Sequence, residues 1–200
     1  MELKHEEKSI TVSLFEPENR SEWVILYLHG NSSSRMEATG IIRFLPYRFS
    51  LASFDFIGCG LNKEEDMISL GVRESKQVET VVHFLEQQDL RVILWGRSMG
   101  AATALKYGRA PIIIADSSFR CFKSLCKHIA KENSPKYVPG CLVSCLFPCV
   151  FYKLRVDIQE KGRYDIEQLD IRQDLKKISQ STFIVFMSGD EDKLIDKSNS

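Results

Sequence analysis

Residues 91 to 102 read RVILWGRSMGAA. The apolar run at the start of this stretch predicts a buried strand, and the small residues at its end favour a helix. A tight strand-to-helix turn leaves little room for side chains, so Gly96 and Gly100 suit positions on either side of it. Ser98 lies between them, where such a turn exposes a serine hydroxyl at the carboxyl edge of a sheet. The stretch therefore predicts a nucleophile elbow at Ser98.

Length and composition describe one globular domain. The chain has 200 residues, and its 27 basic and 27 acidic side chains balance. The chain therefore has no net positive charge that would favour binding to nucleic acid or to an acidic membrane. The N-terminus is charged and lacks an apolar core, so we expect no signal peptide. The six cysteines lack CxxC spacing, so we expect reduced thiols in a cytoplasmic setting. No metal or organic cofactor is implied.

The longest uncharged run extends from Tyr137 to Tyr152. It is too short to span a bilayer comfortably, so we expect a lid or cap helix and no transmembrane segment. Peripheral contact of the protein with a membrane surface is an alternative that the sequence leaves open. Pro148 argues against one straight helix through the run.

Three cysteines in this run, Cys141, Cys145 and Cys149, recur at every fourth residue and therefore share one helical face. We expect them to pack as small apolar side chains against the sheet or an acyl pocket. S-acylation is the alternative.

Strand and helix patterns alternate along the rest of the chain. Besides the strand before Ser98, strands are expected at residues 9–15, 23–28, 49–54, 111–115 and 182–187, and helices at 32–47, 73–88 and from Ser98 to Gly108. This alternation predicts an α/β fold with a doubly wound, mostly parallel sheet. Residues 119–178 do not follow this alternation, because they contain no clear strand pattern. Because loops at the carboxyl ends of strands build the site in such folds, we expect this insertion to be a helical cap over it.

A serine hydroxyl is a poor nucleophile at neutral pH. It needs a base to take its proton and a carboxylate to orient that base. The oxyanion that forms needs donors already in place, and the backbone N–H groups of Asn31 and Met99 are the natural pair. Residues 190–192 follow another strand end and offer carboxylates.

Seven motifs, taken in order, resemble the α/β-hydrolase superfamily. They are HGNSSSR (29–35), FDFIGCG (54–60), ISLGVRE (68–74), GRSMGAATALKYG (96–108), DSSF (116–119), RYDIEQLDIRQDLKKI (163–178) and SGDEDKLID (188–196). The serine-aminopeptidase-like branch, which includes abhydrolase-domain acyl-protein thioesterases, is the most similar. The resemblance implies that Ser98 is the nucleophile, Asp192 the triad acid, and Asn31 and Met99 the oxyanion donors. It also implies a small-molecule or acylated-protein substrate.

Two features depart from this family. Leu61, Asn62 and Lys63 follow Gly60, where the family shows a small polar residue and another glycine. The family order is serine, acid, histidine, and no histidine follows Asp192 in the chain. We therefore expect the base, the last strand and the last helix of the domain to lie beyond residue 200.

Several polar residues have alternative interpretations. Asp116 is the rival acid and His128, within the insertion, is the rival base. His29 precedes the oxyanion turn, and we expect it to order that loop by hydrogen bonding. Arg35, Arg97 and Asp55 are expected to form structural ion pairs.

Two hypotheses about function follow. In the first, the protein is a serine hydrolase that cleaves an ester, thioester or amide through an acyl-enzyme at Ser98. In the second, it is a catalytically dead or truncated α/β-hydrolase-like protein that binds an acyl ligand or a partner protein.

Overall fold

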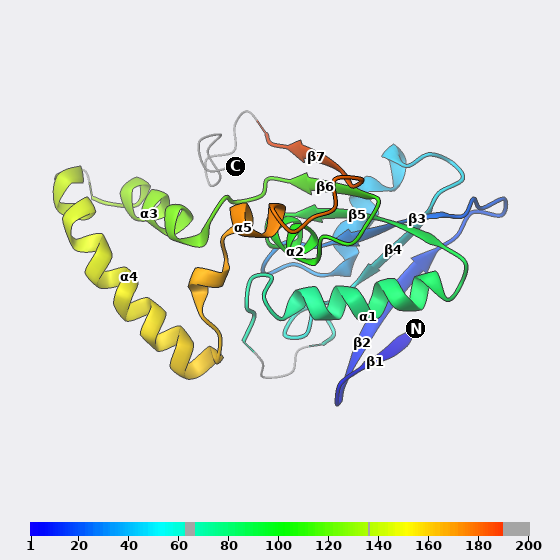
Figure 1. Cartoon of the computed structure of the whole chain (residues 1–200), viewed down its shortest axis with the longest axis horizontal. Coiled ribbons are helices and arrows are strands. Elements are labelled where there is room, and N and C mark those ends of the chain that lie inside the picture. The colour runs from blue at the N-terminus through cyan, green and yellow to red at the C-terminus, as the bar shows by residue number, and fades with distance from the viewer. Residues whose placement is uncertain (63–66, 136, 190–200) are drawn as a thin grey trace.

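A computed structural model describes residues 1–62, 67–135 and 137–189. Within these residues one seven-stranded sheet has the order β1-β2-β4-β3-β5-β6-β7 (Figure 1). The strands are β1 (Glu2–His5), β2 (Lys8–Phe15), β3 (Trp23–Leu28), β4 (Ser50–Phe54), β5 (Arg91–Arg97), β6 (Ile112–Asp116) and β7 (Phe183–Met187). The pairs β1–β2 and β2–β4 are antiparallel, and all other neighbours are parallel. The predicted, mostly parallel sheet is confirmed.

More helices pack on one face of the sheet than on the other. On one face lie α1 (Glu74–Glu86), α2 (Met99–Tyr107) and α5 (Ile171–Leu175), which bury the larger hydrophobic cluster. On the other face the 3-10 helix η1 (Arg35–Phe44) packs against β3 and β4 over a smaller cluster. A central strand covered on both faces is buried along its length, and every residue of β4 is buried.

The insertion between β6 and β7 folds as helices outside the sheet. It contains α3 (Phe122–Glu132), α4 (Gly140–Gly162), the 3-10 helix η2 (Ile166–Gln168) and α5. The α3–α4 hairpin projects past the carboxyl ends of the parallel strands (Figure 1). The buried residues of α4 are Phe147, Phe151 and Gly162, and the ring centroids of the two phenylalanines are 5.5 Å apart.

Four sequence predictions need correction. The sequence does not predict the strand β1, because its residues include charged side chains and show no apolar run. The strand forms through antiparallel pairing with β2. The helix expected at 32–47 is a 3-10 helix that ends at Phe44, two residues before Pro46. The helix α4 continues through Pro148, a solvent-exposed position. The three cysteines of α4 are exposed and do not pack against the sheet. By contrast, Gly108 ends α2 in the left-handed conformation, as predicted.

A substitution at Gly100 tests the packing of α2 on the sheet. A Cβ at Gly100 would lie 2.0 Å from the Leu28 carbonyl oxygen, and backbone atoms cannot move aside cheaply. We expect Gly100→Ala to lower the free energy of unfolding by about 3 kcal/mol or more. The control is Gly40→Ala, because a Cβ at Gly40 meets nothing within 4 Å. Urea unfolding should show a change within about 1 kcal/mol for that variant; equal losses in both would contradict the argument.

Candidate active site

Ser98 occupies a strained turn between β5 and α2. Its backbone has φ 52° and ψ −111°, a region that residues with a side chain rarely adopt. The Ser98 N–H donates a 2.8 Å hydrogen bond to the carbonyl oxygen of Asp116 at the end of β6. This bond ties the turn to the neighbouring strand, so the strained conformation is held from outside the turn.

Two glycines permit the turn to be so tight. A Cβ at Gly96 would lie 2.2 Å from the carbonyl oxygen of Gly100, inside the space that the first turn of α2 fills. Gly100 in turn lies against the carbonyl oxygen of Leu28 at the end of β3. The ends of β3 and β5 and the start of α2 therefore meet backbone to backbone, as the sequence predicted for Gly96 and Gly100.

The loop after β3 lies beside this turn. A Cβ at Gly30 would be 3.9 Å from the Cβ of Ser98, and the Ser33 N–H donates to the Gly30 carbonyl oxygen at 3.3 Å. Asn31 is exposed within this loop. Met99 is buried and is the first residue of α2, where backbone N–H groups have no partner within the helix. Both predicted donor residues thus belong to segments that meet at Ser98.

His29 orders the loop after β3, as predicted. Its ring is buried, with Nδ1 2.8 Å from the Gly30 carbonyl oxygen and Nε2 accepting the Phe56 N–H at 3.2 Å. Nδ1 must therefore carry the proton. Burial lowers the pKa of His29, so the ring stays neutral. With both nitrogens engaged, His29 has no free position to accept a proton from Ser98.

Glu37 is a site residue that sequence reasoning missed. Its carboxylate accepts hydrogen bonds from Tyr27 Oη at 2.9 Å, Arg97 Nη1 at 2.7 Å and the Gly30 N–H at 3.3 Å. Burial opposes ionisation, but hydrogen bonds from these groups and from Ser33 outweigh it and lower the pKa of Glu37. The ionised carboxylate joins η1 to β3, to β5 and to the loop beside Ser98. Only the tertiary fold brings these four segments together.

Arg35 and Asp55 form the structural ion pair that the sequence suggested. The guanidinium of Arg35 pairs with the buried Asp55 carboxylate, which also accepts the backbone N–H groups of Arg35 at 2.7 Å and Leu61 at 2.9 Å. Gly60 has φ 55°, and a Cβ there would collide with the same carboxylate. The pair therefore shapes the 58–60 turn at the carboxyl end of β4.

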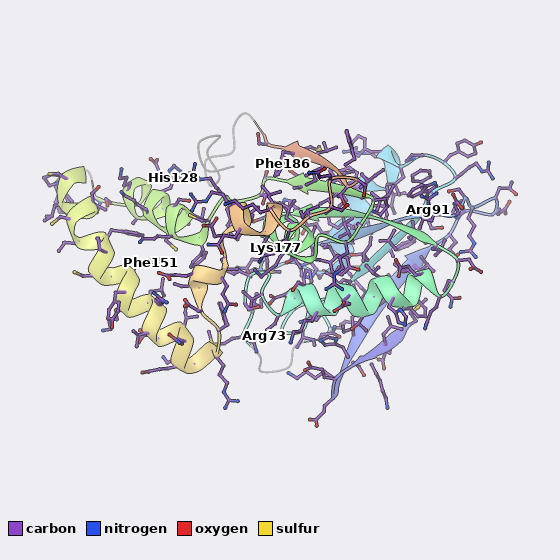
Figure 2. The ribbon with its side chains drawn as sticks, in the orientation of Figure 1. Arg73, Arg91, His128, Phe151, Lys177 and Phe186 are labelled. Carbon is purple, nitrogen blue, oxygen red and sulfur yellow. The ribbon has the colours of Figure 1, made fainter. Side chains whose placement is uncertain are left out.

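Of the candidate acid and base residues, the structure describes Asp116 and His128. Asp192 lies outside the described residues. Asp116 ends β6, pairs with Arg97 of β5 in the sheet register, and accepts the Ser117 hydroxyl at 3.2 Å. His128 lies on α3 in the insertion (Figure 2). The contacts of the other histidines lie elsewhere: His5 contacts Thr80, His29 contacts Gly30 and Phe56, and His83 contacts Gln87.

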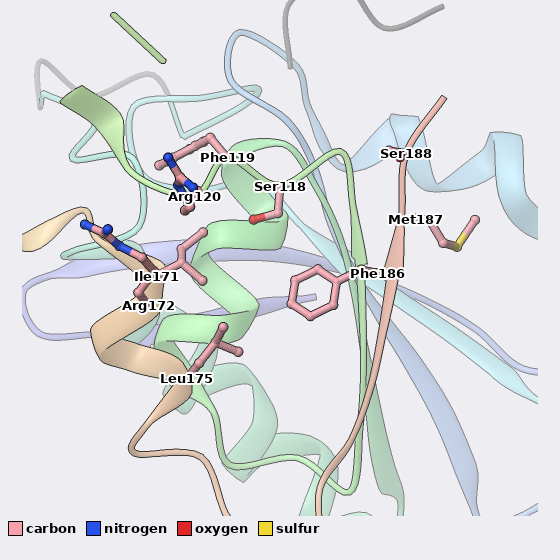
Figure 3. A pocket seen from close by; sticks show the side chains of 9 residues that line it. All are labelled: Ser118, Phe119, Arg120, Ile171, Arg172, Leu175, Phe186, Met187 and Ser188. Carbon is pink, nitrogen blue, oxygen red and sulfur yellow. The ribbon is translucent and has the colours of Figure 1, made fainter. Parts of the chain in front are cut away.

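An apolar cavity of about 350 Å³ lies beside the ends of β6 and β7 (Figure 3). Its walls come from the segment after β6, from α5 and from β7, and Phe186 points into it (Figure 3). The lining residues are Ser118, Phe119, Arg120, Ile171, Arg172, Leu175, Phe186, Met187 and Ser188. The sequence did not predict this cavity, because it depends on how α5 packs beside β7.

Comparison with solved structures identifies the architecture. The chain aligns with a 2,6-dihydroxy-pseudo-oxynicotine hydrolase at a TM-score of 0.65 and 21% identity, covering 92% of this chain and 51% of that one. It aligns with an enol-lactonase from Burkholderia xenovorans at 0.57 and 10% identity, covering 99% and 94%. A haloalkane dehalogenase from Bradyrhizobium elkani gives 0.52 and 14%, covering 64% and 44%. The chain has the α/β-hydrolase fold.

The α/β-hydrolase fold is shared at low sequence identity. The chain spans about half the length of the oxynicotine hydrolase and less than half of the dehalogenase. The sequence matches no protein-family model and no curated protein. Among the described residues, no helix is both long and apolar enough to cross a membrane.

The burial of His29 predicts a pH dependence of stability. Its pKa in the folded state lies below the ordinary value of 6.5, so the unfolded chain binds more protons as pH falls through that value. Stability should therefore decrease below pH 6.5, and His29→Gln should remove much of this dependence. Urea midpoints on both sides of that pH measure it.

The matched control for this experiment is His5→Gln. The pKa of His5 is also lowered by burial, but His5 belongs to the edge strand β1. If His5→Gln removes the pH dependence and His29→Gln leaves it, the assignment to His29 is wrong.

Proposed function

We propose that this protein is a serine hydrolase that cleaves an ester, thioester or amide through an acyl-enzyme at Ser98. The observation that carries the proposal is the strained turn at Ser98, flanked by glycines and seated at the start of α2. A strained turn that presents a hydroxyl at the carboxyl edge of a sheet has the form of a nucleophile elbow. Strain of this kind persists only where the surrounding structure holds it, and such sites are often functional.

The oxyanion donors in this proposal are the backbone N–H groups of Met99 and Asn31. Met99 begins α2, where free N–H groups and the helix dipole both favour negative charge. The loop that carries Asn31 is positioned by His29 and by Glu37, through its bond to Gly30. A donor pair fixed before the reaction lowers the barrier because no reorganisation is needed when charge develops.

The acid in this proposal is Asp192, and the base is a histidine beyond residue 200. The order serine, acid, histidine is the one found in α/β-hydrolases. Asp116 is the weaker candidate, because its position on β6 and its bond from Ser117 give it a structural role beside Arg97.

The proposed reaction has two stages. The base takes the proton of Ser98 as Oγ attacks the substrate carbonyl carbon, and the resulting oxyanion is held by the two N–H groups. Collapse of this intermediate expels an alcohol, thiol or amine that receives the proton. Water, activated by the same base, then attacks the acyl-enzyme and releases the acid.

The apolar cavity near the ends of β6 and β7 supports an acyl group as the part of the substrate that is bound. We propose a small acylated molecule or an acylated protein as substrate, with residues 119–178 acting as the cap. A cytoplasmic setting belongs to the same proposal, because all six cysteines are free. No metal or organic cofactor takes part in the proposed reaction.

One observation favours a second candidate function. His29, the histidine beside the Ser98 turn, has both ring nitrogens engaged by backbone groups and cannot serve as its base. A protein that keeps the fold but lacks the base would bind an acyl ligand or a partner protein without cleaving it. The experiments below separate the two candidates.

Replacing the nucleophile tests the first proposal. Full-length protein should be labelled by a fluorophosphonate and should hydrolyse an activated ester, and Ser98→Ala should lose labelling and about six orders of magnitude in kcat. The control is Ser179→Ala, because Ser179 lies before β7, at the opposite end of the strands. If the full-length wild-type protein is not labelled, the hydrolase proposal fails and the binding role gains support.

The choice of acid can be tested by two matched substitutions. Asp192→Asn should reduce kcat by about four orders of magnitude, because the base loses its orienting carboxylate. Asp116→Asn should leave most of the turnover. Steady-state kinetics of both variants measure this, and the opposite pattern would transfer the acid role to Asp116.

A further inference from the structure

The first half of α4 presents an exposed apolar surface. No charged residue occurs from Tyr137 to Tyr152, yet most of these side chains face solvent. Leu146 is 54% exposed, Val150 64% and Tyr152 68%. We call this surface the α4 strip; it consists of Cys141, Leu142, Cys145, Leu146, Cys149, Val150 and Tyr152.

The α4 strip is not the side of the helix that packs within the protein. The inward side carries Phe147 and Phe151, which are buried, and the ammonium group of Lys123 on α3 lies 5.6 Å from the centre of the Phe151 ring. Leu142, Leu146 and Val150 recur every four residues and lie on the other side. Among the described elements, the strip therefore has no partner that buries it.

The segment that contains the α4 strip is rich in positive charge. Residues 120–154 contain six basic residues and one acidic residue, a net charge of +5, although the whole chain is neutral. Lys123, Lys127 and Lys131 are exposed and spaced by four residues along α3, and Lys153 directly follows the strip. The hairpin is therefore a basic, apolar projection from a protein whose charges balance overall.

We propose that the α3–α4 hairpin docks on the surface of a lipid bilayer that contains anionic lipids. An apolar face with basic neighbours is the chemistry that an anionic interface recognises. Tyrosines stand at both ends of the uncharged run, Tyr137 and Tyr152, and tyrosine favours the headgroup level of a membrane. The lysine side chains can extend to the phosphates while the α4 strip enters the acyl boundary.

The net charge of the segment argues against a dimer, and the length of the uncharged run argues against a membrane-spanning helix. Two copies that packed strip to strip would bring together two segments of charge +5, residues 120–154 of each copy, which is unfavourable. The uncharged run is shorter than the roughly 20 apolar residues needed to span a bilayer, so the helix lies in the interface. Because the hairpin projects past the carboxyl ends of the strands, docking would bring the Ser98 end of the sheet toward the lipid (Figure 1). The inference stands independently of the hydrolase proposal.

Vesicle sedimentation tests the inference. Full-length protein is mixed with vesicles of phosphatidylcholine, with or without phosphatidylserine. Wild type should bind the mixed vesicles more tightly, and Leu142→Glu with Leu146→Glu should weaken this binding by about tenfold or more. Lys127→Gln with Lys131→Gln should weaken binding only to the mixed vesicles, by about fivefold for each lysine.

The matched control is Phe44→Glu with Tyr47→Glu, because these side chains are 65% and 86% exposed at the end of η1. That variant should bind as wild type does, and thermal melts should show that all variants remain folded. The proposal is overturned if wild type binds neither vesicle or if the Leu142, Leu146 variant binds normally. It is also overturned if wild type sediments as a dimer that this variant dissociates, since a second copy would then be the partner.

Discussion

The structure depends on one close contact between backbones, where the start of α2 lies against the ends of β3 and β5. Gly96 faces the first turn of α2, and Gly100 faces the Leu28 carbonyl oxygen, with no space for a side chain at either position. This contact forces the chain to reverse sharply at Ser98. It also aligns the free N–H groups of α2 with the loop that follows β3. The geometry of the Ser98 turn is thus a consequence of main-chain packing in the centre of the sheet.

Buried polar groups hold the loops around that contact. His29, Asp55 and Glu37 come from three different segments, and each has its nitrogen or oxygen atoms engaged by backbone or side-chain partners. An unpaired buried polar group would be costly, so each loop has one favourable arrangement. The network therefore gives irregular segments the rigidity that a site needs. Burial lowers the pKa of His29 and favours its neutral ring, whereas hydrogen bonds outweigh burial at Glu37, lower its pKa and favour the ionised carboxylate.

The α3–α4 hairpin has a different physical character from the rest of the domain. The body buries a core between sheet and helices, whereas the first half of α4 exposes most of an uncharged run, in a segment with a net positive charge. The hairpin is attached to the body near the carboxyl ends of the strands, the same end as Ser98 (Figure 1). The surface proposed to dock on lipid and the turn proposed to carry the nucleophile therefore share one end of the molecule. An apolar cavity beside the ends of β6 and β7 lies at this end as well.

The sequence by itself determined the alternation of strands and helices, and with it the α/β class and the turn at Ser98. These depend on local periodicity and on glycine spacing, which are written in consecutive residues. Contacts between distant segments were decided by the tertiary structure. The edge strand β1 needs β2 as its partner, and Glu37 meets Tyr27, Arg97 and Gly30 only after the sheet has formed. The cysteines of α4 share one helical face as the sequence predicted, but which way that face points depends on how α4 packs against α3.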